Sequence, residues 1–179
     1  MNDLKYIVAI LLERMSPVNF MASFLIWVMF AILFALWVLD KRIKKEQIYH
    51  AVLASIMAWL LSEVIKSWFP SLRPFELNNK PTFTLTVPHG SAFPSDHSAI
   101  AFGLAVSVWS HHKRLGIAFI VAAILVGLGR VLGNVHYFTD ILGGAALGVI
   151  SVIILEKLHV ALQRNDEKSS GVKRKKHRT

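Results

Sequence analysis

The feature that most constrains the fold of this sequence is a long apolar run without charges from Val18 to Leu39, closed by Asp40, Lys41 and Arg42. Such a run is long enough to cross the roughly 30 Å hydrocarbon core of a bilayer as a helix. Further apolar segments follow at about residues 48–65, 97–109, 115–128 and 141–155. Because a spanning segment must satisfy its own backbone hydrogen bonds, the sequence predicts an all-α, polytopic bundle of about five transmembrane helices, possibly six.

The composition excludes an ordinary soluble domain. Hydrophobic residues make up 54% of the chain, charged residues only 17%, and the mean hydropathy is +0.50, whereas a soluble domain of this length needs more polar surface. The formal net charge of +9 does not indicate nucleic acid, because the cations sit in short connectors and a tail. Cysteine is absent, which excludes a disulfide framework and a thiolate metal site.

Three regions are expected along the chain. Residues 1–17 form an N-terminal interfacial helix or a short extra span, with no pattern of a cleaved signal peptide. Residues 18–158 form the transmembrane domain, within which 67–96 is a loop rich in Pro, Asn, Ser and Thr. Residues 159–179 form a basic tail, and we expect the whole polar stretch from 156 onward to be disordered. In the last span, Gly144 and Gly148 are predicted to form a helix-packing face.

The distribution of Lys and Arg orients the spans. Cations occupy alternate connectors and the tail, at Lys41, Arg42, Lys44, Lys45, Lys113, Arg114 and in the run Lys173–Arg178. The positive-inside rule places these segments in the cytoplasm of a cell-membrane protein, with the C-terminus cytoplasmic and attracted to anionic lipids. The loop 67–96 and the turn 129–140 are then predicted to lie together on the extracytoplasmic side.

The polar residues that are expensive at membrane depth gather in those two extracytoplasmic segments. They are Lys66, Arg73, Ser95, Asp96, His97, Arg130, His136 and Asp140, with Pro74 and Pro94 beside them. Taken singly, Lys66 and Arg130 could be anchors at helix ends, and Ser95 and Asp140 could be N-caps. Because ionisable groups at membrane depth are usually functional, three cations, two histidines and a carboxylate at one face favour an active site.

The spacing of these residues resembles the three-part signature of the type 2 phosphatidic acid phosphatase superfamily, over about residues 48–155. The parts are Lys66-x6-Arg73-Pro74, Pro94-Ser95-Asp96-His97 and Arg130-x5-His136-x3-Asp140. Two positions depart from it: Gly129 stands where the family usually has Ser, and Asp96 where it often has Gly. The run from Phe93 to His97 is similar to that of bacterial undecaprenyl-diphosphatases of the bacitracin-resistance type.

The residue types suit phosphoryl transfer without a metal or other cofactor. Two guanidiniums and an ammonium can neutralise the phosphoryl oxygens, and the few carboxylates make a two-metal site improbable. His136 is the expected nucleophile, oriented by Asp140 four residues later, and His97 the expected general acid and base. The resemblance implies the same roles through a phosphohistidine. The expected phosphate-binding set is Lys66, Arg73, Pro74, Ser95, Asp96 and Arg130.

The sequence therefore predicts a membrane lipid phosphatase that acts at the extracytoplasmic face. The resemblance favours undecaprenyl diphosphate as substrate, giving undecaprenyl phosphate and inorganic phosphate. Phosphatidylglycerophosphate or phosphatidic acid is the alternative substrate. A protein that binds or transports a phosphate lipid without cleaving it is the alternative class, although such a protein needs no His-x3-Asp pair.

Overall fold

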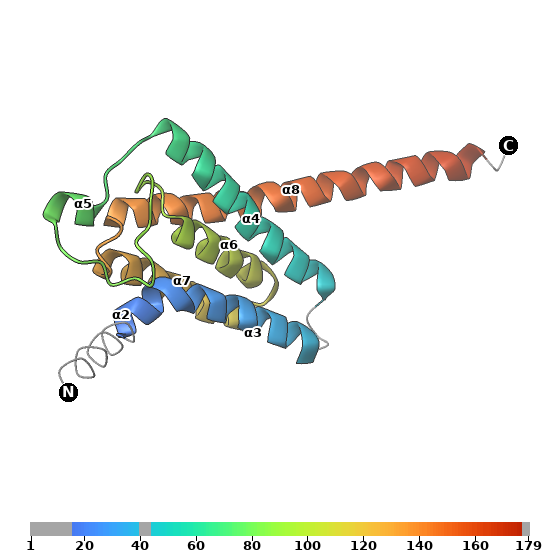
Figure 1. The fold of residues 1–179 in the computed structure, drawn as a ribbon. Coiled ribbons are helices and arrows are strands. Elements are labelled where there is room, and N and C mark those ends of the chain that lie inside the picture. The colour runs from blue at the N-terminus through green and yellow to red at the C-terminus, as the bar shows by residue number, and fades with distance from the viewer. Residues whose placement is uncertain (1–15, 40–43, 177–179) are drawn as a thin grey trace.

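The computed structural model of the chain describes residues 16–39 and 44–176, with side chains described as far as Arg164. The first fifteen residues of the expected N-terminal helix lie outside the described residues. Within the described ranges the order of helices is α2 (Pro17–Asn19), the π-helix η1 (Phe20–Phe24), α3 (Leu25–Leu39), α4 (Lys45–Trp68), α5 (Pro74–Asn78), α6 (Asp96–His111), α7 (Lys113–Leu132) and α8 (Phe138–Lys176) (Figure 1).

Four stretches of the described chain are long and apolar enough to cross a membrane: Pro17–Leu39, Lys45–Trp68, Lys113–Leu132 and Phe138–Arg164. They contain four of the five predicted spans. The remaining predicted span, residues 97–109, corresponds to α6. This helix has 16 residues, fewer than the roughly 20 that a bilayer usually requires. The all-α transmembrane bundle is confirmed.

The end of the chain departs from expectation. Disorder was predicted from residue 156, but α8 continues as one helix to Lys176 and extends beyond the bundle (Figure 1). The segment after Leu155 is rich in Glu, Lys, Leu, Ala, Gln and Arg, which are strong helix formers. With no proline to stop the helix, the apolar span continues into the polar tail.

The centre of the bundle is α6, which packs against α4, α7 and α8. Its buried face is built from small residues, among them Ala99, Ala101, Gly103 and Ala105, which let the helix backbones come close. The predicted packing face on α8 is confirmed. A Cβ on Gly144 would overlap the carbonyl oxygen of Ser95, and one on Gly148 would lie 2.6 Å from the backbone nitrogen of Gly103.

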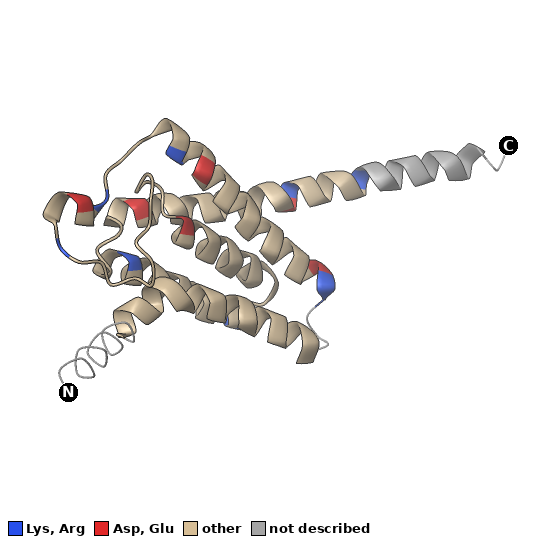
Figure 2. Cartoon of the chain, viewed as in Figure 1, with Lys and Arg blue, Asp and Glu red and all other residues tan. Residues whose placement is uncertain are grey.

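Charged residues of the described chain gather toward the two ends of the bundle, leaving its middle apolar (Figure 2). One end, here called the motif end, holds α5, the loop that follows it, the starts of α6 and α8 and the end of α7 (Figure 1). The opposite end holds the start of α4 and the junction between α6 and α7. The three sequence motifs thus meet at one end.

Candidate active site

The first element of the site is a buried histidine–carboxylate pair at the start of α8. His136 lies in the turn between α7 and α8, and its Nδ1 is 3.3 Å from Oδ2 of Asp140. The same carboxylate oxygen accepts the backbone N–H of Tyr137 at 2.8 Å. Asp140 is therefore a first-turn residue that reaches back to the helix start, as in a capping box, rather than the N-cap itself. This double contact fixes both the carboxylate and the imidazole.

The second element is Arg73, whose guanidinium is 2% exposed and surrounded by acceptors. Nε donates to the carbonyl of Gly90, Nη2 to those of His89 and Ser91, and Nη1 to that of Val135. Nη1 also lies 3.2 Å from Nε2 of His136. These five acceptors match the five N–H donors of an arginine. Arg73 thus joins the loop after α5 to the turn before α8.

The same contacts define the tautomer of His136. Arginine can only donate, so Nε2 of the imidazole accepts and keeps its lone pair, while Nδ1–H donates to Asp140. Burial lowers the pKa of His136, the hydrogen bond to Asp140 opposes this shift, and Arg130 and Arg73 add to it, so that the pKa is about 4. The imidazole is neutral at physiological pH, and its available lone pair is on Nε2.

A local cap explains how Arg73 and Pro74 reach their positions. Pro74 is the first residue of α5, where its fixed φ and missing N–H are compatible with a helix start. Glu76 accepts the backbone N–H of Arg73 at 2.6 Å. Pro74 is buried and offers no hydrogen-bond donor to a phosphate, so its place in the motif is explained by the backbone conformation that it gives to Arg73.

The third element connects α4 and α6 through Asp96. One carboxylate oxygen, Oδ2, contacts Nζ of Lys66, and the other accepts the hydroxyl of Ser62 at 2.6 Å. Lys66 also pairs with Glu63 at 3.1 Å. The structure therefore brings Lys66 and Asp96 together at the motif end, but as partners of each other.

The fourth element is a set of buried donors that have no protein partner in the described part of the chain. At the motif end they are Nε of Arg130 and the hydroxyls of Ser95 and Ser98; a fourth, the hydroxyl of Ser151, lies farther along α8. Ser95 is the N-cap residue of α6, as predicted, but its hydroxyl does not cap the helix. Arg130 donates through Nη1 to the carbonyl of Ala22 at 3.1 Å. Buried polar groups are rarely left unpaired, so these donors are suited to an anion.

His97 is the second residue of α6 and is half-buried. Arg130, His136, Lys66 and Arg73 are all close enough to act on it electrostatically. The structure thus gathers the three predicted cations and both predicted histidines around one place. Among the described residues, no group of three or more His, Asp or Glu side chains is arranged to hold a metal ion.

Sequence reasoning missed several participants. Ser62, Glu76 and the carbonyls of Ala22 and Val135 all contact predicted site residues. A serine in an apolar span one turn before Lys66 was a usable signal for Ser62. The two carbonyls had no such signal in the sequence, because every residue has a backbone carbonyl.

The structure gives a physical reason for Gly129 in place of the family's Ser. A Cβ at this position would lie 2.6 Å from the backbone nitrogen of Ala22 and 2.7 Å from the carbonyl carbon of Met21. The backbone of η1 occupies the space that a side chain would need. Glycine at this motif position thus accompanies close packing of η1 on α7.

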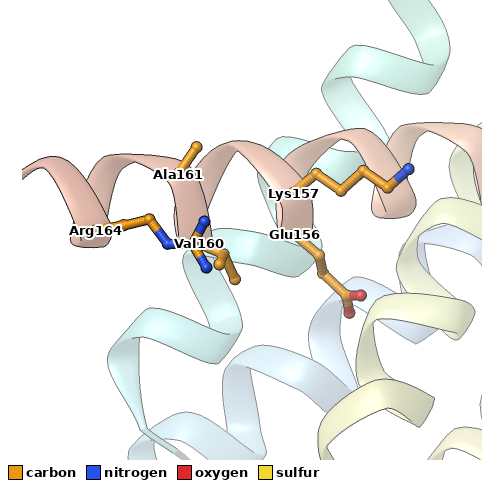
Figure 3. Close-up of a pocket in the computed structure, with 5 residues that line it drawn as sticks. All are labelled: Glu156, Lys157, Val160, Ala161 and Arg164. Carbon is orange, nitrogen blue, oxygen red and sulfur yellow. The ribbon is translucent and has the colours of Figure 1, made fainter.

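Two cavities lie at different distances from these site elements. A cavity of about 270 Å³ is lined by Pro70, Ser71, Leu72, Glu76, Gly90 and Ser91, next to Arg73. A cavity of about 540 Å³ is lined by five α8 residues, Glu156, Lys157, Val160, Ala161 and Arg164 (Figure 3). Glu156 lies sixteen residues beyond Asp140 on the same helix, about 24 Å away at 1.5 Å per residue. The larger cavity is therefore separate from the motif end.

The chain is similar to several known membrane proteins. It is 28% identical over 146 residues to the bacitracin transport permease protein BcrC of Bacillus licheniformis, covering 80% of this chain and 71% of that one. It is 34% identical over 116 residues to an undecaprenyl-diphosphatase of Sulfolobus acidocaldarius, covering 64% of this chain and 55% of the relative.

Among solved structures, Aquifex aeolicus LpxE aligns with a TM-score of 0.61 and 28% identity, covering 73% of this chain and 77% of that one. A PAP2-type phosphatidylglycerolphosphate phosphatase of Bacillus subtilis shares the fold, with a TM-score of 0.57 and 24% identity, covering 81% of this chain and 74% of that one. Residues 47–164 match the PAP2 superfamily. With its motif residues gathered at one end of a helical membrane bundle, the chain belongs to the PAP2 superfamily and is a membrane phosphatase of that group.

Proposed function

We propose that this chain hydrolyses a lipid diphosphate, with undecaprenyl diphosphate as the substrate, through a phosphohistidine on His136. The observation that carries the proposal is a pair of buried donors with no partner among the described residues, Nε of Arg130 and the hydroxyl of Ser95, beside a histidine held by a carboxylate. A tetrahedral anion can satisfy such donors, and they stabilise charge that develops on its oxygens.

The proposed first half-reaction uses the lone pair on Nε2 of His136. It attacks the terminal phosphorus, forming a P–N bond while the P–O bond to the lipid phosphate breaks. His97, which takes up a proton when the negative charge of the bound substrate offsets the surrounding cations, gives that proton to the leaving oxygen. Asp140 stabilises the positive charge that develops on the imidazole, and Arg73, whose Nη1 lies against Nε2, transfers this hydrogen bond to a phosphoryl oxygen.

The second half-reaction releases phosphate. His97 takes a proton from a water molecule, whose oxygen attacks the phosphohistidine; the P–N bond breaks and inorganic phosphate leaves. His97 thereby recovers the proton that it gave away. The cycle uses no metal, so we expect turnover to survive excess chelator.

The choice of a diphosphate rests on similarity to relatives named undecaprenyl-diphosphatases. A relative named phosphatidylglycerophosphatase B, from Bacillus subtilis, supports the alternative substrate at 32% identity over 123 residues. The deciding experiment measures phosphate release by purified protein from undecaprenyl diphosphate, phosphatidylglycerophosphate and phosphatidic acid, each with and without chelator. A higher kcat/KM for either glycerolipid would reassign the substrate, and recovery by Mg²⁺ after loss in chelator would contradict the metal-free scheme.

A transport or binding function is the second candidate, favoured by the relative named a transport permease. Binding requires the cations but not a neutral imidazole held by a carboxylate. Stoichiometric binding of a lipid diphosphate by the wild-type protein, without phosphate release, would support this candidate over the enzyme.

We further propose that the motif end faces the extracytoplasmic side. Lys45 and Lys113, which begin α4 and α7, lie at the opposite end of the bundle, and cations favour the cytoplasm. The chain has no cysteine, so Asn79→Cys and Lys113→Cys can be probed singly. An impermeant thiol reagent on intact cells should label the first variant only. The reverse pattern would place the site in the cytoplasmic leaflet.

A further inference from the structure

Phosphate binding does not explain the carboxylate of Asp96. An ionised carboxylate has no proton to donate and repels a phosphate electrostatically. In the structure both of its oxygens are occupied by donors from α4: Oδ2 by Nζ of Lys66 and Oδ1 by the hydroxyl of Ser62. Asp96 therefore connects the start of α6 to α4.

Ser62 fixes the orientation of the Asp96 carboxylate. Its side chain is fully buried, and its hydroxyl lies 2.6 Å from Oδ1 of Asp96, the short distance typical of a bond to a charged oxygen. One oxygen is thereby held by a rigid helix position, which turns the other toward Lys66. Asp96 is 26% exposed and Lys66 only 12%, so their contact is partly shielded from solvent.

The donors of Lys66 can be counted. An ammonium carries three N–H groups; one is directed at Asp96 and one at Glu63. Within the described part of the chain the third has no partner. Arg73, in contrast, has an acceptor for each of its five donors. Lys66 is thus anchored by two contacts and retains one donor for a ligand.

Anchoring matters because a long, unrestrained lysine side chain has many rotamers and therefore a large conformational entropy. A free lysine would lose that entropy when it binds the substrate, whereas a lysine already held in place binds without this loss. The glutamate contact contributes less to the anchoring, because Glu63 is 49% exposed and exposed pairs of this spacing are weak.

We propose that Asp96, oriented by Ser62, is a positioning residue that holds the Lys66 ammonium with one N–H directed at the substrate phosphate. The inference rests on the proposed phosphatase function. It replaces the expected role of Asp96 as a phosphate ligand, and it gives the departure from Gly at this motif position a function.

The test is a double-mutant cycle on full-length purified protein, with Asp96→Asn, Lys66→Gln and the double variant. Kinetics on undecaprenyl diphosphate and inhibition by vanadate, a phosphate analogue, are measured for each. Asn keeps the shape of Asp and removes the charge. We expect Asp96→Asn to raise KM and weaken vanadate inhibition by about tenfold, a coupling of about 1.4 kcal/mol. In the Lys66→Gln background, Asp96→Asn should change neither KM nor vanadate inhibition.

Glu46→Gln provides a matched control. Glu46 is the first-turn acid of α4, as Asp96 is of α6, but it lies at the opposite end. If Asp96 only stabilises a helix N-terminus, both substitutions should lower thermal stability alike, and Asp96→Asn should leave vanadate inhibition unchanged. Ser62→Ala should weaken vanadate inhibition in the same direction as Asp96→Asn, to a smaller extent.

The possible results separate the two levels of the proposal. Additive effects of Asp96→Asn and Lys66→Gln, or vanadate inhibition that is unchanged or stronger in Asp96→Asn, would overturn the positioning role while leaving the phosphatase intact. A wild-type protein that releases no phosphate from any of the lipid phosphates would instead overturn the proposed function itself.

Discussion

The two ends of the bundle contain the same kinds of residues in different arrangements. At the opposite end, His50 packs its ring 4.6 Å from that of His159 and 6.1 Å from that of His111. At the motif end, His136 is 3% exposed and held between a carboxylate and a guanidinium. Histidines and cations alone do not identify a site.

What distinguishes the ends is how polar groups are satisfied. Nε2 of His112 lies 2.9 Å from Oε1 of Gln47, and Nε2 of His159 lies 2.7 Å from Nε2 of Gln163. Both of those histidines are half-exposed, and their partners are neutral amides. At the motif end, Nε of Arg130 and the buried hydroxyls of Ser95 and Ser98 have no partner within residues 16–39 and 44–176. Because burying an unpaired donor costs about 1–3 kcal/mol, such donors are typical of a place where a ligand binds.

The largest expected effect comes from removing the imidazole at each end in turn. His136→Ala should lower kcat by about 10⁴-fold or more, because no other described group provides a nucleophile held in this way. His159→Ala should change kcat by less than twofold. Phosphate release from a lipid diphosphate measures both, and thermal unfolding checks that each variant is folded. Comparable losses in the two variants would remove the functional distinction between the ends.

A second comparison concerns the carboxylates of α8. Asp140→Asn should lower kcat by about 10³-fold, since the amide can keep the contact but neither fixes the tautomer nor stabilises the imidazolium. Glu156→Gln, sixteen residues along the same helix, should have little effect. Acid-quench measurement of the phosphoenzyme should find its formation slowed in Asp140→Asn. Normal phosphoenzyme formation in that variant would contradict the role of Asp140.

The third prediction uses the pH dependence of stability. Because burial lowers the pKa of His136 to about 4, from an ordinary value near 6.5, the unfolded chain binds this proton more readily than the folded protein. Stability should therefore fall as pH decreases from about 6.5 to 4. His136→Gln should lose less stability over the same range, as followed by tryptophan fluorescence. Equal pH dependence of the two proteins would mean that His136 is not neutral and buried as described.

The smallest of these effects concerns packing between η1 and α7. Gly129→Ser restores the residue usual in the family but places a Cβ against Met21 and Ala22. We expect both Gly129→Ser and Gly129→Ala to destabilise the protein by about 1–3 kcal/mol, with kcat no higher than wild type. Thermal unfolding and kinetics of the two variants check this. A serine variant that is more active, and as stable as wild type, would show that the hydroxyl was the missing element.

The sequence alone predicted the helical membrane architecture and the motif residues of the candidate site, but not Ser62, Glu76 or the carbonyls that contact those residues. Hydropathy marked the spans, because a bilayer tolerates only long apolar helices and closed barrels. Three spaced motifs identified His97, His136, Asp140 and the three cations, and the structure places them together at one end. Gly144 and Gly148 were recognisable as a packing face because small residues permit close helix contact.

Only the tertiary structure decided what each charged group does. Arg73 meets a carbonyl 62 residues away, Asp96 a hydroxyl 34 residues away and Arg130 a carbonyl 108 residues away. Local sequence carries no record of such partners, since carbonyls are present at every residue and a serine in a span usually bonds its own helix. Whether a donor is used by the protein or left for a ligand depends on what the fold brings within about 3 Å of it.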